Sequence, residues 1–294
     1  MKTKGIDVSK WQGNIDWQKV KAAGIEFAML RGGFGKTTTQ IDSKFEQNYR
    51  NAKAVGMPIG VYHYSYAKSV EDAKKEAQFC LSYLKGKQFE YPIAFDIEDS
   101  SQANLGKSTL TAITKAFCEE VEKAGYYVCI YANLDWLKNK LDMTALSDYD
   151  VWVAQWASKC TYGGAYGMWQ YSDKGKVNGI TGNVDMDEAY KNYPNIMKVN
   201  GLNGFFKANI PDPTKPTPTP TPKPTTYKKG QVIILNHTPL YVSATAKKPS
   251  NYKTGTFYIY DGVAVNGRFK ITTRKSMCGL KPAKFFVTGW IELK

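Results

Sequence analysis

The sequence predicts an α/β protein in two parts: an eight-stranded barrel built from five β/α units and three further strands, and then a small all-β domain. Strand-like and helix-like segments alternate through the first two thirds of the chain, whereas short strand-like segments alone fill its end. Between the two lies PDPTKPTPTPTPKP at 211–224, which holds seven of the thirteen prolines. Alternating proline favours an extended polyproline II spacer, so the two parts are expected to be separate domains.

Alternation of this length favours a parallel sheet, and eight strands are enough to close an irregular, TIM-like (β/α)5(β)3 barrel. An open doubly wound sheet is the structural alternative, but it would need a glycine-rich turn after the first strand, and none is present. The strands are expected at 5–9, 26–32, 58–64, 92–98, 126–132, 150–156, 167–172 and 183–187. The helices are expected at 16–23, 42–55, 69–84, 108–124 and 133–141.

We therefore expect a barrel domain over 1–200, a linker over 207–226 and an all-β domain over 227–294. In the last domain, glycine, proline and asparagine break the chain into short strand-like segments. These segments are QVIILN, LYVSA, TFYIYD, VAVNG, RFKITT and FFVTGWIEL.

The net charge of +14 is concentrated at the end of the chain. Residues 225–294 contain ten Lys, two Arg, one Asp and one Glu, so they carry 12 − 2 = +10. Residues 207–224 contain three Lys and one Asp and add +2, which leaves +2 for residues 1–206. A basic domain favours an anionic partner, either nucleic acid or an anionic polymer of the bacterial wall. A merely solvated basic surface is the alternative.

Hydropathy and the cysteine and histidine content argue against several classes of protein. No run of 18 apolar residues is present, so we expect no membrane partner. The segment MKTKGIDVSK lacks the apolar core of a signal peptide, and five scattered cysteines are typical of free, buried thiols, so we expect storage in a cytoplasm. With two histidines and no CxxC pair, neither a metal site nor a cofactor is expected.

The stretch YPIAFDIEDS at 91–100 places acids in an otherwise apolar run. Side chains alternate along a strand, so Asp96 and Glu98 share one face, about 6.6 Å apart along the chain. Burying two like charges is costly unless the site uses them. Active sites of such barrels lie at the carboxyl ends of the strands, where this pair falls.

Two further acids are expected at the same mouth. Asp7 lies between Ile6 and Val8, and Asp185 has apolar neighbours in the same way, so both point away from the apolar face of their strands. Taken singly, each is as easily a capping or ion-paired acid. Asp99 and Asp187 are better interpreted as caps or loop acids.

A carboxylate pair suits glycoside hydrolysis, in which one acid protonates the leaving oxygen and its neighbour steadies an oxocarbenium-like transition state. Aromatic side chains on the inward face of their strands would line a saccharide groove, although ordinary barrel packing explains each of them equally well. Gln170 is a candidate hydrogen-bonding group for a sugar amide or hydroxyl, whereas His63 is expected on the outer face, in the core. The aromatic candidates are Tyr62, Tyr64, Tyr131 and Trp156.

Other chemistries fit poorly. LGKST at 105–109 is similar to the end of a P-loop, but Ser101 stands where the first glycine is required. GxSxG is absent, and two histidines leave little room for a catalytic triad.

The motifs as a set resemble glycoside hydrolase family 25, the Chalaropsis-type lysozymes of phage endolysins and autolysins. They are GIDVSKWQG at 5–13, GVYHYS, AFDIED at 94–99, IYAN and NVDMDEAY at 183–190, so the resemblance covers about residues 1–195. Chitinase-type enzymes share DxE but show a longer series, DxxDxDxE, and here Ala94 interrupts it.

The resemblance implies cleavage of the β-1,4 bond between N-acetylmuramic acid and N-acetylglucosamine in peptidoglycan. Glu98 then matches the general acid, and Asp96 the acid that stabilises the transition state or orients the acetamido group. Asp7 and Asp185 match supporting acids. Whether water attacks directly or after neighbouring-group participation stays open at this point.

The C-terminal part resembles bacterial SH3-type wall-binding domains, through LYVSA, TGTFYIYDG and VTGWIEL. Together the parts resemble a phage endolysin, which waits in the host cytoplasm until a holin releases it to the wall. The expected partners are peptidoglycan and anionic wall polymers, without nucleic acid or membrane. A non-catalytic wall-binding protein, a chitinase-like hydrolase and a nucleic-acid-binding protein are the alternatives.

Overall fold

The computed structural model describes residues 2–206 and 227–293, so the predicted linker at 207–226 lies outside the described residues. The chain divides into two compact units, Met1–Ile210 and Pro211–Lys294. Among the described residues, no helix has the length and apolar character needed to cross a membrane.

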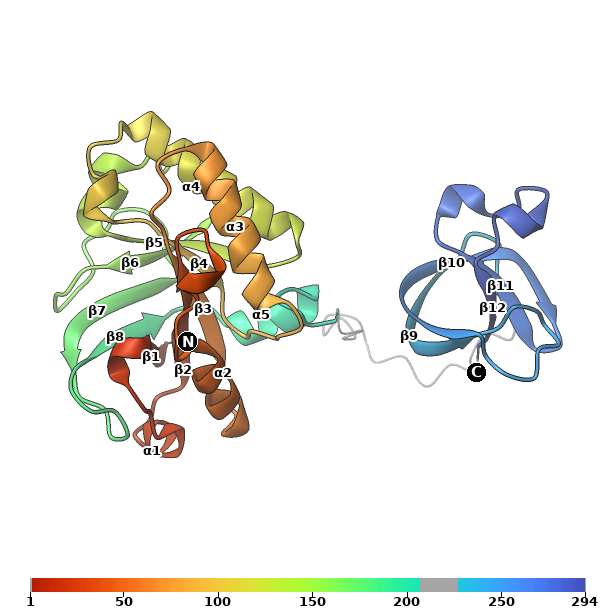
Figure 1. Ribbon diagram of the computed structural model, residues 1–294, viewed down its shortest axis with the longest axis horizontal. Helices are drawn as coiled ribbons and strands as arrows, with labels where there is room; N and C mark the ends of the chain where they lie inside the picture. The colour runs from red at the N-terminus through yellow and green to blue at the C-terminus, as the bar shows by residue number, and fades with distance from the viewer. Residues whose placement is uncertain (1, 207–226, 294) are drawn as a thin grey trace. The chain divides into compact units, whose positions relative to one another are not determined.

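In the first unit, eight strands close a barrel in chain order (Figure 1). Strands β1 to β7 are parallel, as predicted, but β8 runs antiparallel to both β7 and β1, so the prediction of a parallel sheet fails for this strand. Only residues 176–183 join β7 to β8, too few for the crossover that a parallel pair requires. The strands are β1 (Thr3–Val8), β2 (Phe27–Phe34), β3 (Ile59–Tyr64), β4 (Ile93–Asp96), β5 (Val128–Asn133), β6 (Asp150–Ala154), β7 (Met168–Gly175) and β8 (Val184–Ala189).

Helices follow the first four strands as predicted. Several begin with side-chain caps that satisfy free backbone amides: Asp16 accepts from the amide of Lys19, and Ser69 from that of Asp72. The predicted helix 133–141 is instead a single π-helical segment, Trp136–Lys140, and a helix absent from the prediction follows β8. The helices are α1 (Trp17–Ala22), α2 (Phe45–Ala54), α3 (Val70–Leu84), α4 (Lys107–Lys123) and α5 (Tyr193–Asn200).

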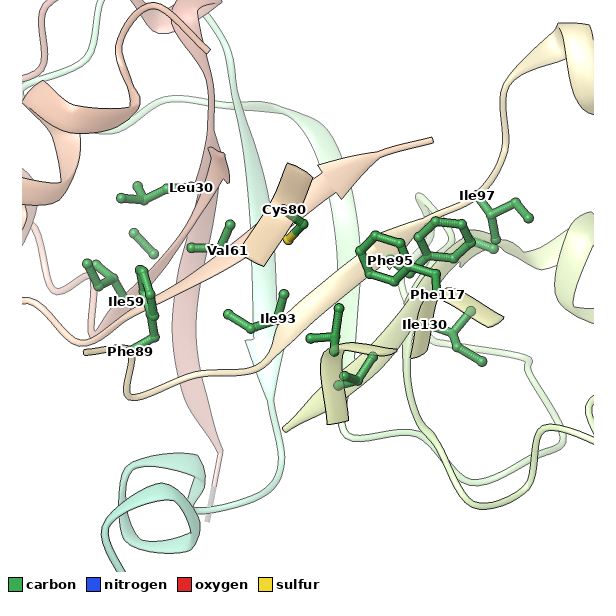
Figure 2. Close-up of a cluster of buried hydrophobic side chains, with 14 of the residues drawn as sticks. Leu30, Ile59, Val61, Cys80, Phe89, Ile93, Phe95, Ile97, Phe117 and Ile130 are labelled. Atoms are coloured by element: carbon green, nitrogen blue, oxygen red, sulfur yellow. The ribbon is translucent and has the colours of Figure 1, made fainter. Parts of the chain in front are cut away.

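The main core lies between the barrel and its helices. Figure 2 shows Ile93, Phe95 and Ile97 on one side of β4 and its extension, with Phe95 stacked on Phe117 of α4 at a centroid distance of 4.2 Å. This apolar contact fixes which face of β4 turns outward, so the alternate residues must face the barrel interior. Burial of the outer face therefore places Asp96 inside the barrel.

A second cluster fills the interior of the barrel below the polar residues. The rings of Phe27 and Tyr91 stack there at 4.3 Å, and Trp152 packs edge-on against Tyr131. Tyr193 of α5 joins the same cluster, so α5 covers this end of the barrel. The interior is packed at one end and polar at the other.

The described part of the second unit, residues 227–293, forms a four-stranded antiparallel sheet in the order β12-β11-β10-β9, which agrees with an all-β domain. The six predicted strands are wrong in number: LYVSA is not a strand, because Tyr241 pairs only with Trp290 in an isolated bridge, and TFYIYD and VAVNG form one long strand. Its core includes Ile259, Ile271 and Ile291. The strands are β9 (Val232–Leu240), β10 (Asn251–Val265), β11 (Arg268–Thr272) and β12 (Gly289–Glu292).

All five cysteines are free thiols. Four are buried, whereas Cys160 is only half-buried, contrary to the expectation that all would be buried.

Candidate active site

A groove with a cavity of about 360 Å³ opens at the polar end of the barrel. All nine residues predicted for the site line it. The lining residues are Asp7, Ser9, Trp11, Gln12, Arg31, Tyr62, Tyr64, Asp96, Glu98, Tyr131, Trp152, Trp156, Gln170, Asp173 and Asp185.

The carboxylate pair lies where β4 ends. Asp96 is the last residue of the strand and is 4% exposed, whereas Glu98 follows it and is half-buried. Burial raises the pKa of Asp96 well above its usual range; the charge of Glu98 raises it further, and the Arg31 guanidinium opposes both. Burial also raises the pKa of Glu98. A hydrogen bond that Asn133 Nδ2 donates to Glu98 Oε2 at 3.2 Å lowers this pKa in part. Both groups therefore favour protonation more than ordinary carboxyls do.

Asp7 and Asp185 face each other across the β1–β8 pair, where they are register partners. Because β8 is antiparallel, Asp185 reaches the mouth from the beginning of its strand, while Asp7 reaches it from near the end of β1. Burial is the main cause that raises the pKa of Asp7, followed by the charges of Asp187 and Asp185. Burial likewise raises the pKa of Asp185 to about 6.

Asp187 belongs to this cluster, so its interpretation as a cap or loop acid is wrong. It is fully buried inside the barrel and accepts a hydrogen bond from the Trp152 indole nitrogen at 2.9 Å. Burial raises the pKa of Asp187 well above its usual range. Its shared parity with Asp185 is the sequence pattern that indicates this position. Asp99, by contrast, is a cap as predicted, accepting from the amide of Ser101.

Gln170 connects this cluster to the wall of the groove. Its Nε2 donates to Asp7 Oδ2 at 2.7 Å, while its Oε1 accepts from Tyr131 Oη at 3.1 Å and from Trp156 Nε1 at 3.0 Å. With 3% of its surface exposed, Gln170 holds other site residues in place.

The four predicted aromatic residues differ in accessibility. Tyr131 is buried against Trp152, which also lies 6.2 Å from the Tyr62 ring. Tyr64 is half-buried and donates to Asp99, whereas Trp156 is 61% exposed at the edge of the groove. Trp156 therefore offers open ring surface, Tyr62 and Tyr64 are both half-buried, and Tyr131 mainly builds the wall.

Sequence reasoning missed Arg31 and Trp11. Arg31 belongs to β2 and faces inward by the same alternation as Met29; its Nε and an Nη contact Asp42 Oδ2 at 2.8 and 2.7 Å. Trp11 lies in a short 3-10 turn after β1 and is 75% exposed. A lone tryptophan in a loop carries no periodicity, so only the fold locates it at the groove.

His63 lies outside the site, as predicted. It is fully buried on the outer face of β3, where its Nδ1 and the Tyr83 hydroxyl are 2.8 Å apart. Among the residues that the structure describes, no three His, Cys, Asp or Glu side chains are grouped to hold a metal ion.

A pair of carboxyl groups in a groove at the mouth of a β/α barrel is an arrangement that glycoside hydrolases use. The family model for glycosyl hydrolases family 25 matches residues 6–180, more than half of the chain, and the chain therefore belongs to that family. The match ends before the linker.

Relatives and solved structures agree with this assignment. The chain is 34% identical over 188 residues to the autolytic lysozyme of Clostridium acetobutylicum, covering 63% of this chain and 55% of that protein. It is 32% identical over 200 residues to lysozyme M1 of Streptomyces globisporus, covering 63% and 66%. The CTP1L endolysin structure superimposes with a TM-score of 0.59 at 28% identity, covering 67% of this chain and 69% of that one. A lysozyme of Streptomyces coelicolor gives a TM-score of 0.55 at 28% identity, covering 64% and 92%.

Proposed function

We propose that this chain is a muramidase that hydrolyses the β-1,4 bond between N-acetylmuramic acid and N-acetylglucosamine in bacterial peptidoglycan. The observation that supports this most is the pairing of half-buried Glu98 with buried Asp96 in the groove of a family 25 barrel. The chain spans 55% of the length of the clostridial autolytic lysozyme, and the proposal concerns this chain alone.

Glu98 acts as the general acid. Asn133 donates a hydrogen bond to its Oε2, and the proton that Glu98 carries passes to the glycosidic oxygen. Partial burial keeps this proton bound at a higher pH than in an exposed glutamate.

Asp96 stabilises the transition state or orients the substrate's acetamido group. Its Oδ1 is buried and has no hydrogen-bond partner among the described residues, so it is free to accept from a substrate N–H. Its charge is needed beside a developing oxocarbenium ion, and Arg31 is the cation that favours this charged form. Asp7 and Asp185 support the site from the neighbouring strands.

The C-terminal domain, in this proposal, is an SH3-like module that holds the enzyme on the wall. Its charge of +10 suits anionic wall polymers, and tethering raises the effective concentration of enzyme at an insoluble substrate. Full-length protein should sediment with purified walls at physiological salt, and a chain ending at residue 206 should sediment much less. Equal, steeply salt-dependent binding of the full-length protein to walls and to free DNA would contradict a wall-specific role.

We further propose that the enzyme is an endolysin, held in the host cytoplasm until a holin opens a route to the wall. The likeness to the CTP1L endolysin supports this role. Expression in a bacterial host should cause lysis only when a holin is co-expressed, and lysis without a holin would contradict it.

Chitinase-like hydrolysis and non-catalytic wall binding are tested together. Purified walls should be hydrolysed, and oligomers of N-acetylglucosamine should be cleaved far more slowly. Preference for the chitin-type oligomers would favour a chitinase-like hydrolase. Binding without cleavage of either substrate would favour a non-catalytic wall-binding protein.

A further inference from the structure

A second hollow of about 200 Å³ adjoins the acid-lined groove at the side of β2 and β3. The two share Trp11, Arg31 and Tyr64, so they form one continuous surface. The lining residues of the second hollow are Lys10, Trp11, Arg31, Phe34, Tyr64 and Tyr66.

This hollow combines exposed aromatic rings with a free cation. The Lys10 ammonium lies 4.8 Å from the centroid of the Trp11 ring, which is 75% exposed, and the Tyr66 ring is 44% exposed. Within the described residues, no carboxylate is within ion-pair distance of the Lys10 ammonium. Arg31, in contrast, already contacts Asp42. Lys10 is therefore the cation left available to a ligand.

The other end of the groove has a different character. A hollow of about 510 Å³ adjoins it there and shares Glu98, Tyr131 and Trp156 with the groove. No lysine or arginine is among its lining residues, and Asp135 adds a second acid to Glu98. One end of the groove is thus suited to an anionic group and the other to neutral sugars.

We propose that the hollow at Lys10 and Trp11 binds the carboxylate-bearing substituent of a muramoyl residue, and that the end at Trp156 binds neutral parts of the glycan. The inference rests on the proposed function. Muramic acid differs from glucosamine by a lactyl ether, whose carboxyl group is either free or extended by a peptide with carboxylates of its own. The sugar lies against the Trp11 ring, and the Lys10 ammonium forms a charge-assisted hydrogen bond with the carboxylate. The site thereby selects for muramoyl residues in one orientation.

The test compares kcat/KM on native walls and on walls whose carboxylates have been converted to neutral amides with carbodiimide and ethanolamine. For the wild-type enzyme, the loss of a charge-assisted hydrogen bond should lower kcat/KM about tenfold on the neutralised walls. Lys10→Met should show this loss already on native walls and no further loss on neutralised ones. Because the C-terminal domain is the same in both proteins, its contribution cancels when the two ratios are compared.

Lys85→Met is the matched control, because Lys85 is an exposed lysine at the end of α3, outside the groove. It should respond to neutralisation like the wild type. An amidase removes the peptide and frees the lactyl carboxylate, so treated walls distinguish the two sources of charge. Retained sensitivity to Lys10→Met shows that the lactyl carboxylate suffices, and lost sensitivity shows that the peptide carboxylates are required.

Equal ratios of native to neutralised kcat/KM in wild type and Lys10→Met would overturn the inference while leaving the muramidase intact. If the wild-type enzyme released no sugar ends from native walls, the proposed function would itself fail and the inference with it.

Discussion

Gln170 Nε2 donates a hydrogen bond to Asp7 Oδ2 over 2.7 Å, which connects a side chain of β7 to the first strand across the barrel mouth. The other end of the same amide accepts from Tyr131 and Trp156. One buried side chain therefore fixes an acid, a wall residue and an exposed aromatic ring of the groove relative to one another.

Replacing Gln170 by Leu should destabilise the protein by about 1–3 kcal/mol, since Tyr131 and Trp156 would lose their buried acceptor. Urea unfolding monitored by tryptophan fluorescence measures this loss. Gln170→Glu is a second variant for comparison. It keeps the acceptor for Tyr131 and Trp156, removes the donor to Asp7 and adds another acid to the cluster. Two variants as stable as the wild type would show that this network does not hold the site together.

Glu98→Gln should lower kcat on walls by about 10²–10⁴-fold, the range expected for loss of a general acid. The amide keeps an oxygen that accepts from Asn133, so the thermal midpoint should change little. Activity assays and calorimetry on the same preparation separate the two effects. Substantial residual hydrolysis by a correctly folded variant would remove Glu98 from its assigned role.

Asp187→Asn should stabilise the protein at pH values well above the usual pKa of an aspartate. The folded-state pKa of Asp187 is raised by burial, so its contribution to stability is present at low pH and is lost as the pH rises through that raised value. Asparagine does not titrate, and its amide oxygen still accepts from Trp152. The free energy of unfolding, measured by chemical denaturation at pH 5 and pH 8, should decline less between these pH values in the variant than in the wild type.

Asp187→Ala is the matched control. It removes the charge but leaves the Trp152 indole nitrogen without an acceptor, at a cost of about 1–3 kcal/mol. If the Asn and Ala variants were equally destabilised, the charge of Asp187 would not be the dominant cost at this position.

Glu76 gives a second dependence of stability on pH. It is 1% exposed and accepts a hydrogen bond from the backbone amide of Tyr66. Burial raises the pKa of Glu76 from 4.5 to about 7. Its stabilising contribution is therefore complete below pH 4.5 and is lost as the pH rises through about 7. The difference in the pKa of Glu76, 7 − 4.5 = 2.5, corresponds to about 3 kcal/mol in the free energy of unfolding.

Glu76→Gln should flatten the decline in the free energy of unfolding between pH 4.5 and 7. Neighbouring His63, whose pKa burial lowers to about 3, acts in the opposite direction in both proteins, because the unfolded chain gains its proton near pH 6.5. The comparison of the two curves reports the effect of Glu76 together with any change at His63, whose Nε2 lies 3.8 Å from Glu76 Oε2. Parallel curves for variant and wild type would contradict a raised pKa at this residue.

Much of the site follows from alternation along strands. Ile97 points outward and Asp96 inward because the strand period is two and the outer face packs on Phe117 and its neighbours. The same reasoning locates Asp7, Asp185 and the inward aromatic residues correctly at the groove.

The parts that the sequence did not predict depend on contacts between distant segments. Asp187 shares the inward parity of Asp185, but its partner in the interior is Trp152 from another strand, a pairing that no local pattern reveals. Trp11 and Arg31 meet at the groove only after β1 and β2 have paired. The antiparallel β8 was predictable in principle, since the segment before it is too short for a crossover helix.

Muramidase activity is tested most directly by digesting purified bacterial walls and identifying the new sugar ends by reduction and mass spectrometry, with Glu98→Gln as the control. A muramidase that depends on Glu98 should produce new reducing ends on N-acetylmuramic acid with the wild-type enzyme and none with the variant. New reducing ends on N-acetylglucosamine, or equal release by the variant, would contradict it.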